Sequence, residues 1–375
     1  MRVGLFAHRL AQRGPTGISR YVRELVRALG EAAGSQVELV LASTREAEPA
    51  NWIPPSVRTH VLPWPRRSVQ AAWCLGAGPR LERSLGRVDV AHLITTFPPV
   101  KTAAPQLVTV HDVMPFEHPE WYPRLERLIF RRDAELVLRR ARRIVVPSVY
   151  VADRLVALLG ADSARIETVP HGVSGTFTGA QREHDIAATC ARFGVAPGRF
   201  AVCVGWVATR KNLIPVIRAI AQLRGQRIPL VLVGPDGHGA ETVDAEIARL
   251  DGTVRVLRTG FLSDEETAAL VRGAGVLLHP SLGEGFGLVP LEAMAVGTAV
   301  IAARASSVPE VVGDAAVLID QPLEPKAWGD ALMDVMGSTE RRAELAAAGE
   351  QWAATFSWER AARTMLQIYD DVARD

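Results

Sequence analysis

The chain has 375 residues, of which 48% are hydrophobic, and its formal net charge is +2. Its length favours two domains, and its three widely spaced cysteines exclude a disulfide framework or a cysteine-based zinc site. No run of eighteen uncharged apolar residues occurs, and the apolar N-terminal segment is too short for a signal peptide, so we expect a cytoplasmic protein without a membrane-spanning helix.

The charge is unevenly divided along the chain. Residues 1–180 hold 24 Lys and Arg against 16 Asp and Glu, a balance of +8, whereas residues 181–375 have a balance of −6. This asymmetry predicts that the first half meets an anionic partner. Nucleic acid is not expected, because no known binding motif accompanies the arginines and the second half is acidic.

Short apolar runs alternate with amphipathic helical patterns throughout the first half, which predicts a doubly wound, largely parallel sheet. A stretch rich in Gly, Ser and Thr at residues 173–182 is interpreted as a linker. The expected strands are residues 3–7, 37–42, 88–93, 107–110 and 143–147, and the expected helices are residues 18–33, 123–142 and 150–159.

The same alternation begins again after the linker, which predicts a second Rossmann-like domain. Ser357 is a good N-cap for a closing helix over residues 358–373. We therefore expect an N-terminal domain of residues 1–180, joined by the C-terminal helix 357–375, and a C-terminal domain of residues 181–356. The expected strands of the second domain are residues 200–204, 230–233, 254–257, 276–279 and 299–302.

Two features of the first half are candidates for ligand contacts. Gly17 follows the first strand and opens a helix, where a glycine lets the backbone approach a phosphate or a sugar; an ordinary turn is the alternative. His111 and Asp112 end a buried strand, where polar side chains are costly unless they are satisfied or used. His111 is therefore a candidate catalytic residue, with a structural histidine as the alternative, and Asp112 is either a second ligand contact or a residue that merely orients its loop.

Eight arginines lie between residues 124 and 143, interleaved with apolar residues. Two interpretations stay open at this point. The segment could be an amphipathic surface for anionic lipid headgroups. Alternatively, it could be a solvated basic helix that packs its apolar stripe on the domain.

Arg210 and Lys211 follow the expected strand 200–204 and precede a helix. Two adjacent cations at the carboxyl edge of an α/β sheet can neutralise a diphosphate, although a solvated basic turn has the same residues. Leu262 follows the strand 254–257 and could present backbone groups to a nucleoside base.

Glu284 and Glu292 lie on either side of a Gly-rich turn that runs into a helix, with seven residues between them. Backbone N–H groups at a helix start attract phosphate, and a carboxylate accepts paired hydrogen bonds from neighbouring hydroxyls. The pattern therefore predicts that the two carboxylates hold opposite ends of a nucleotide-sugar, with the amides of Phe286, Gly287 and Leu288 between them.

This segment resembles the signature of the retaining nucleotide-sugar glycosyltransferases of family 4, which have the GT-B fold of two Rossmann-like domains facing a central cleft. The match includes the Arg-Lys-Asn at residues 210–212 and the closing helix. The chain departs from the family pattern at two places. It has a single glycine, Gly17, where many relatives have two, and it has Ala208 and Thr209 where relatives often have an acidic residue and Pro. The matching residues are His279, Pro280, Ser281, Glu284, Gly285, Phe286, Gly287, Pro290, Glu292, Ala293, Gly297, Pro309, Glu310 and Gly313.

The resemblance implies an N-terminal acceptor domain and a C-terminal domain that binds the nucleotide-sugar. It implies that His111 and Glu284 face the donor sugar, Glu292 holds the ribose, and Arg210 and Lys211 contact the diphosphate. No cofactor is expected, and no metal, because the chain lacks the Asp-x-Asp pair with which transferases of the other major fold hold one.

The segment 111–121 is similar to the mannosyltransferase-like branch, which implies GDP-mannose as donor and a bacterial surface polysaccharide or lipid-linked glycan as acceptor. A UDP-hexose donor is the alternative within the same fold. A nucleotide-sugar epimerase and a non-catalytic nucleotide-sugar-binding subunit are the alternatives from other classes. The basic segment 124–143 adds a possible peripheral position on the inner membrane face.

Overall fold

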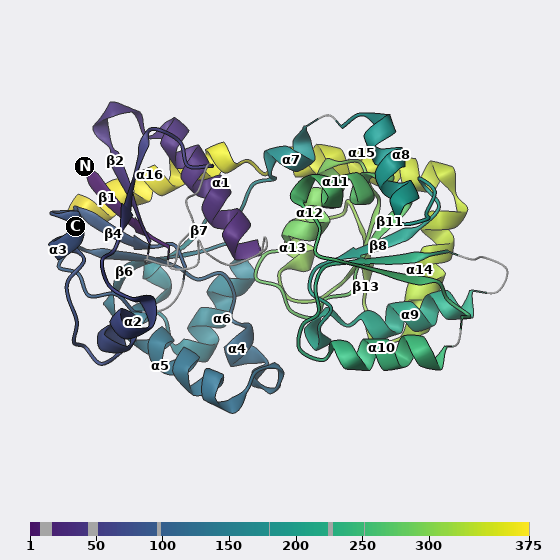
Figure 1. Cartoon of the computed structure of the whole chain (residues 1–375), viewed down its shortest axis with the longest axis horizontal. Helices are drawn as coiled ribbons and strands as arrows, with labels where there is room; N and C mark the ends of the chain where they lie inside the picture. The colour runs from purple at the N-terminus through teal and green to yellow at the C-terminus, as the bar shows by residue number, and fades with distance from the viewer. Residues whose placement is uncertain are drawn as a thin grey trace. The chain divides into compact units, whose positions relative to one another are not determined.

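A computed structural model describes residues 1–7, 17–43, 52–95, 99–179, 181–223, 228–250 and 252–374. The chain divides into two compact units (Figure 1). Unit 1 consists of Met1–Gly172 and Ser357–Asp375, and unit 2 consists of Val173–Phe356.

Unit 1 is built on a parallel sheet that has seven strands within the described residues, in the order β3-β2-β1-β4-β5-β6-β7. The order reverses between β1 and β4, as in a doubly wound fold. The strands are β1 Arg2–Phe6, β2 Glu38–Ser43, β3 Val57–Val61, β4 Val90–Leu93, β5 Gln106–Thr109, β6 Ala141–Val146 and β7 Ile166–Thr168.

Helices cover both faces of this sheet. Apolar residues of α1 and α16 pack on one face, and those of α2, α3, α5 and α6 pack on the other (Figure 1). Short 3₁₀ turns lie at Gly34–Gln36, Pro119–Trp121 and Ser163–Arg165. The helices of unit 1 are α1 Gly17–Ala32, α2 Arg66–Cys74, α3 Glu82–Leu85, α4 Met114–Glu117, α5 Arg124–Arg140, α6 Val149–Leu159 and α16 Trp358–Arg374.

Unit 2 repeats the same topology with six parallel strands among its described residues, in the order β10-β9-β8-β11-β12-β13. The order reverses between β8 and β11. The strands are β8 Ala201–Val204, β9 Leu230–Val233, β10 Val256–Gly260, β11 Val276–His279, β12 Val300–Ala303 and β13 Val317–Ile319.

One face of this sheet carries α7, α8, α11, α12 and α13, and the other carries α9, α10 and α14. A 3₁₀ turn lies at Thr209–Lys211. The helices of unit 2 are α7 Gly175–Thr178, α8 Glu183–Arg192, α9 Leu213–Gln222, α10 Ala240–Arg249, α11 Asp264–Gly273, α12 Leu288–Ala295, α13 Val308–Val312, α14 Pro325–Gly337 and α15 Thr339–Ala353.

The predicted pair of doubly wound parallel sheets is confirmed, and three local expectations differ. The expected linker 173–182 contains α7, whose Phe177 is buried in the core of unit 2, so the division at residue 172 comes eight residues before the expected one. The helix expected over 123–142 ends at Arg140 because Ala141 already begins β6. The short strands β3, β7 and β13 were not expected; three of the five residues of β3 are polar, and β7 and β13 have three residues each.

The C-terminal helix α16 belongs to unit 1. Ser357 caps it, because its Oγ accepts a hydrogen bond from the backbone N–H of Arg360 at 3.2 Å. Deeper in the core, the phenol of Tyr369 is 2.8 Å from Nδ1 of the buried His92. Within the described part of the chain, no helix is both long and apolar enough to cross a bilayer.

Candidate functional site

The predicted cations and the first predicted carboxylate of unit 2 meet where the strand order reverses. Arg210 and Lys211 follow β8, and Glu284 follows β11. The two loops are joined by a hydrogen bond from the Leu282 N–H to the Arg210 carbonyl at 3.0 Å. Open α/β sheets bind ligands at this position, outside the carboxyl ends of their strands.

Two glycines set the shape of the loop that carries the cations. Gly205 follows β8 with φ 129°, and Gly234 follows the neighbouring β9 with φ 136°. A Cβ atom on Gly234 would lie 2.3 Å from the Gly205 carbonyl oxygen, so only glycine fits there. The close approach of the two backbones therefore fixes the start of the loop that leads to Arg210 and Lys211.

Replacing Gly234 with alanine is expected to lower the free energy of unfolding by roughly 3 kcal/mol, because it adds both a steric clash and a strained φ. Gly337 at the end of α14 is the control, since a Cβ there meets nothing within 4 Å. Its alanine variant should change stability by less than about 1 kcal/mol. Urea unfolding of both variants measures the difference.

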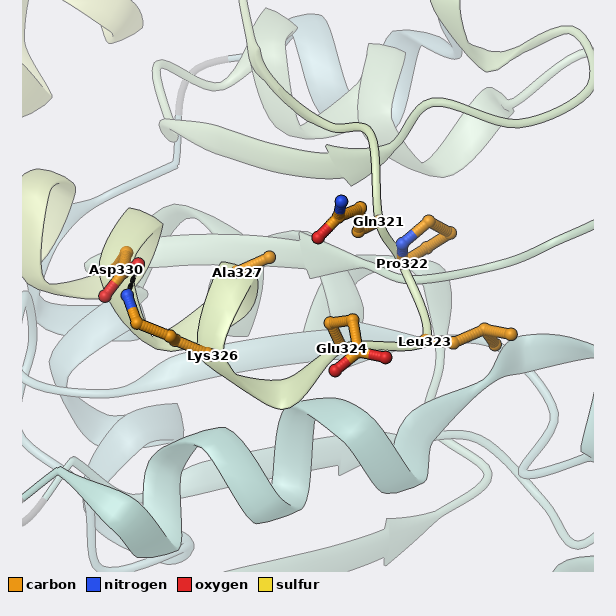
Figure 2. Close-up of a pocket in the computed structure, with 7 residues that line it drawn as sticks. All are labelled: Gln321, Pro322, Leu323, Glu324, Lys326, Ala327 and Asp330. Atoms are coloured by element: carbon orange, nitrogen blue, oxygen red, sulfur yellow. Dashed lines mark hydrogen bonds and ion pairs between the residues drawn. The ribbon is translucent and has the colours of Figure 1, made fainter.

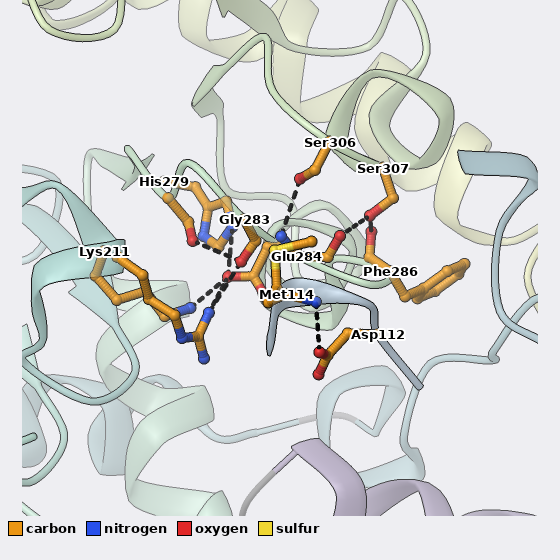
Figure 3. A network of polar contacts seen from close by, with 11 residues as sticks. Asp112, Met114, Lys211, His279, Gly283, Glu284, Phe286, Ser306 and Ser307 are labelled. Carbon is orange, nitrogen blue, oxygen red and sulfur yellow. Dashed lines mark hydrogen bonds and ion pairs between the residues drawn. The ribbon is translucent and has the colours of Figure 1, made fainter. Parts of the chain in front are cut away.

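Glu284 holds both cations through a single oxygen (Figure 3). Its Oε1 accepts from Lys211 Nζ at 2.5 Å and lies 3.4 Å from Arg210 Nη1. Arg210 Nη1 also donates to the Gly283 carbonyl at 3.0 Å. Nε2 of His279, at the end of β11, is 3.5 Å from the same Oε1. None of these contacts uses Oε2 of Glu284, so this oxygen can accept a hydrogen bond from a ligand.

Burial and charge act in opposite directions in this cluster. Burial alone would raise the pKa of Glu284, but Lys211 and Arg210 outweigh it and hold that pKa well below its usual range. Burial lowers the pKa of Lys211, and Glu284 opposes this. Burial also lowers the pKa of His279, which favours the neutral form of its imidazole. The cluster thus presents two cations and one carboxylate.

Two serines that the sequence reading did not assign support the Glu284 turn (Figure 3). Ser306 Oγ accepts from the Glu284 N–H at 2.9 Å. Ser307 Oγ is close to the carbonyls of Glu284 and Phe286, at 3.0 and 2.8 Å. Ser306 itself has φ 49°, a backbone conformation that is rare for a residue other than glycine. Its hydrogen bond to the Glu284 N–H is one of the contacts that stabilise it there.

The rest of the predicted turn lies against the core of unit 2. Phe286 is buried beside Phe356, with their ring centroids 6.0 Å apart, so its side chain is structural. Gly287 has φ 111° and precedes α12, which begins at Leu288. Glu292 lies inside that helix and is 2% exposed. The turn therefore leads the chain from Glu284 into the helix that carries the second carboxylate.

Leu262 lies after β10, at the same carboxyl edge of the sheet, and is buried. A hollow beside the cation cluster is lined by Trp206, Lys211, His279 and Ser281, among others. Another hollow, at the start of α14, contains none of the predicted site residues. It is lined by Gln321, Pro322, Leu323, Glu324, Lys326, Ala327 and Asp330 (Figure 2).

His111 and Asp112 lie just beyond the carboxyl end of β5 in unit 1. His111 follows β5 and is buried, and its Nε2 is 2.8 Å from the Ile94 carbonyl, to which it donates. The ring of Tyr21 packs edge-on against it, with centroids 4.6 Å apart. Asp112 Oδ1 accepts from the Met114 N–H at 3.1 Å, so Asp112 orients its own loop.

Gly17 is the first residue of α1 and is exposed, and a Cβ there would meet nothing within 4 Å. The preceding Pro15 and Thr16 lie outside the described residues. Among the residues that the structure describes, no three His, Cys, Asp or Glu side chains gather as a metal-binding group.

Two family models match the chain. One is described as Glycosyltransferase Family 4 and matches residues 15–175, and the other is described as Glycosyl transferases group 1 and matches residues 195–352. Together they cover most of both units, and the second contains the Lys211–Glu284 cluster.

Two curated proteins are similar in sequence. The D-inositol 3-phosphate glycosyltransferase of Nocardia farcinica is 32% identical over 308 residues, which are 79% of this chain and 64% of that protein. The O-antigen chain mannosyltransferase B of Escherichia coli is 27% identical over 268 residues, 70% of this chain and 69% of that one. The match thus spans less than two thirds of the first relative's length.

The solved structure of Anabaena Alr3699/HepE in complex with UDP and glucose has a TM-score of 0.76 to this chain. Its sequence is 17% identical, and the match covers 99% of this chain and 100% of that one. At this identity, the likeness shows that the two chains share their fold.

Proposed function

Because the chain belongs to the family 4 glycosyltransferases of the GT-B fold, we propose that it is a nucleotide-sugar-dependent, retaining hexosyltransferase. The proposed donor is GDP-mannose. The proposed acceptor is a hydroxyl of a bacterial surface polysaccharide or a lipid-linked glycan. Unit 2 would bind the donor, and unit 1 would bind the acceptor.

The observation that carries this proposal is the Lys211–Arg210–Glu284 cluster at the switch point of unit 2. Two cations that share one carboxylate oxygen leave net positive charge where a diphosphate would lie. Lys211 is only 8% exposed, so its charge acts in a medium of lower dielectric constant than water. This placement favours electrostatic stabilisation of a departing nucleoside diphosphate.

The remaining roles are proposed from the resemblance to the family. Glu284 would accept from a hydroxyl of the donor sugar through Oε2, while its Oε1 keeps the two cations in place. Glu292 would hold the ribose, and the backbone N–H groups of residues 286–288 would meet the diphosphate at the start of α12. We further propose that His111 contacts the sugar and that Gly17 and Leu262 line the donor site. Retention rests on the family alone, since we assign no nucleophile.

The sugar and the base of the donor rest on likeness to other proteins. The O-antigen chain mannosyltransferase B of Escherichia coli supports mannose. The complex of Anabaena HepE with UDP and glucose supports the alternative, a UDP-hexose donor. Both fit the same cation cluster, because the cluster would meet the diphosphate that the two donors share.

Calorimetric titration with GDP and then UDP, in the presence of EDTA, tests the proposal. We expect GDP to bind with a Kd about tenfold or more below that of UDP, since a difference of about 1.4 kcal/mol in base contacts suffices. Binding in EDTA would show that the chain's own cations neutralise the diphosphate. A preference for UDP would keep the transferase and replace the donor, whereas binding of neither would contradict the assignment of the site.

Product analysis separates the transferase from its rivals. A transferase extends an acceptor and releases a nucleoside diphosphate. An epimerase would convert the nucleotide-sugar to an isomer without any acceptor. A binding subunit would retain nucleotide affinity but give neither product with any glycan lipid.

A lipid-linked acceptor would place the reaction at a membrane. We therefore propose that the chain works on the inner membrane face as a peripheral protein, through the basic segment 124–143. The balance of +8 over residues 1–180 supports attraction to an anionic surface.

A further inference from the structure

The first half of helix α5 exposes large aliphatic side chains. Leu125 and Leu128 are each 70% exposed, and Ile129 is 48% exposed. In the second half of the same helix, Val137 is 1% exposed and Leu138 is 5% exposed, because these residues pack against the sheet. The apolar residues at the start of α5 therefore do not form the packed stripe that was one of the two open interpretations.

Arginines share this exposed face. Residues three or four apart lie on one side of a helix, so Arg132 lies beside Leu128 and Ile129, and Arg139 follows two turns later. Arg124 and Arg132 are both exposed. Arg131 is also exposed, with Glu135 as a partner at 3.2 Å. The aliphatic side chains thus project between guanidinium groups.

The end of helix α2 extends the face. Arg132 Nη2 donates to the Cys74 carbonyl at 2.8 Å, which brings the next residue, Leu75, beside α5. Leu75 is 73% exposed. Lys101 Nζ, which donates to the Gly76 carbonyl at 3.4 Å, adds another cation at the same place. Figure 1 shows α2 beside α5.

We propose that this surface docks on an anionic lipid bilayer, with its aliphatic side chains in the headgroup region and its cations on lipid phosphates. We call it the α2–α5 surface and define it as Leu75, Lys101, Arg124, Leu125, Leu128, Ile129, Arg132 and Arg139. The inference rests on the proposed function, because a membrane surface is where a lipid-linked acceptor would be met.

Charge selects the bilayer over a second copy of this chain. A symmetric dimer through the α2–α5 surface would bring two copies of the same net positive patch together, which like-charge repulsion disfavours. A bilayer with anionic lipids supplies the opposite charge and an apolar layer within a few ångströms of it. A few aliphatic side chains give only shallow insertion, so binding needs both contributions and should be reversible.

Vesicle flotation of the full chain tests this. We expect binding to phosphatidylcholine vesicles that contain phosphatidylglycerol, and at least about tenfold weaker binding to phosphatidylcholine alone. Raising the salt concentration should weaken binding to the anionic vesicles, because salt screens the cations. Replacing Arg124 and Arg139 with Gln should cost about fivefold per arginine. Leu128→Ser should also weaken binding, since it removes one apolar contact.

Leu323→Ser is the matched control. Leu323 is 63% exposed, but it lies in unit 2, on the loop before α14, and should leave vesicle binding unchanged. Equal loss in Leu323→Ser and Leu128→Ser would overturn the proposal, as would equal binding to neutral and anionic vesicles. A concentration-dependent dimer that Leu128→Ser abolishes would instead identify the surface as a contact between copies.

Nucleotide titration of Leu128→Ser separates this inference from the proposed function. If the α2–α5 surface only docks on lipid, the variant binds the nucleoside diphosphate as the unchanged chain does. Failure of vesicle binding with intact nucleotide binding would remove the lipid surface and leave the transferase. Vesicle binding without nucleotide binding would instead remove the transferase assignment and leave the lipid surface.

Discussion

Replacing Lys211 with methionine is expected to lower kcat/KM for sugar transfer by a factor of about 10²–10³, the usual effect of losing one preorganised group that stabilises developing charge. Lys211 is 8% exposed and its ammonium is held by Glu284 at 2.5 Å, so the cation is already in place before the donor binds. Methionine fills a similar volume but carries no charge. Initial rates of nucleoside diphosphate release measure the effect.

Lys326→Met serves as the control for this variant. Lys326 is also a lysine of unit 2, but its side chain is 84% exposed and pairs with Asp330 at 2.5 Å. This change should leave transfer unaffected. Thermal unfolding of both variants shows whether the fold survives. Near-normal turnover by a folded Lys211→Met chain would exclude Lys211 from the diphosphate site.

The alternation of apolar and amphipathic segments was enough to predict both sheets and most of their strands. Local errors occurred where tertiary contacts decide the outcome. Phe177 lies in a segment whose composition is typical of a linker, yet it is buried in the core of unit 2. Strand β3 has the sequence VRTHV, and it forms because β2 offers a free edge to pair with. Neither contact leaves a periodic pattern in the sequence.

Sequence reasoning also found the residues that meet at the switch point, because strand ends and Gly-rich turns mark that edge. It could not supply their partners. Ser306 and Ser307 are more than twenty positions from the turn that they hold, and no motif distinguishes them from other serines. The choice between a packed and an exposed apolar stripe on α5 likewise depended on side-chain burial, which the helical period alone does not give.

Replacing Glu284 with glutamine is expected to lower transfer by about 10²-fold, because hydrogen bonds that involve a charged group contribute about 1.5–3 kcal/mol. The variant keeps the shape of the side chain and an oxygen toward Lys211. It loses the negative charge that would accept from the donor sugar and that opposes the lowering of the Lys211 pKa by burial. Affinity for the nucleoside diphosphate without its sugar should change much less, since removing a carboxylate also reduces repulsion of phosphate.

The pH dependence of transfer gives this variant a signature. The pKa of Glu284 lies well below its usual range, so the ion pair with Lys211 is complete above the ordinary pKa of a glutamate and weakens only as the pH falls through the lowered value. The unchanged chain should therefore show no loss of this pair between pH 6 and pH 8, about two units or more above the ordinary glutamate value. In Glu284→Gln, burial and the neighbouring Arg210 lower the pKa of Lys211 without the opposing charge of Glu284, so transfer should fall toward alkaline pH earlier than in the unchanged chain.

Glu284→Asp separates charge from reach. The aspartate keeps the negative charge but is one methylene shorter, so it cannot meet Lys211 at the same distance without a shift of the 283–285 backbone, which Ser306 and Ser307 hold. If charge on Lys211 is the main contribution, the aspartate variant keeps the original pH profile and loses rate. If Oε2 holds the sugar, both variants lose transfer while nucleotide titration still shows binding. Normal transfer in both would refute any role of Glu284 at the donor sugar, and would leave the carboxylate as a structural partner of the cations alone.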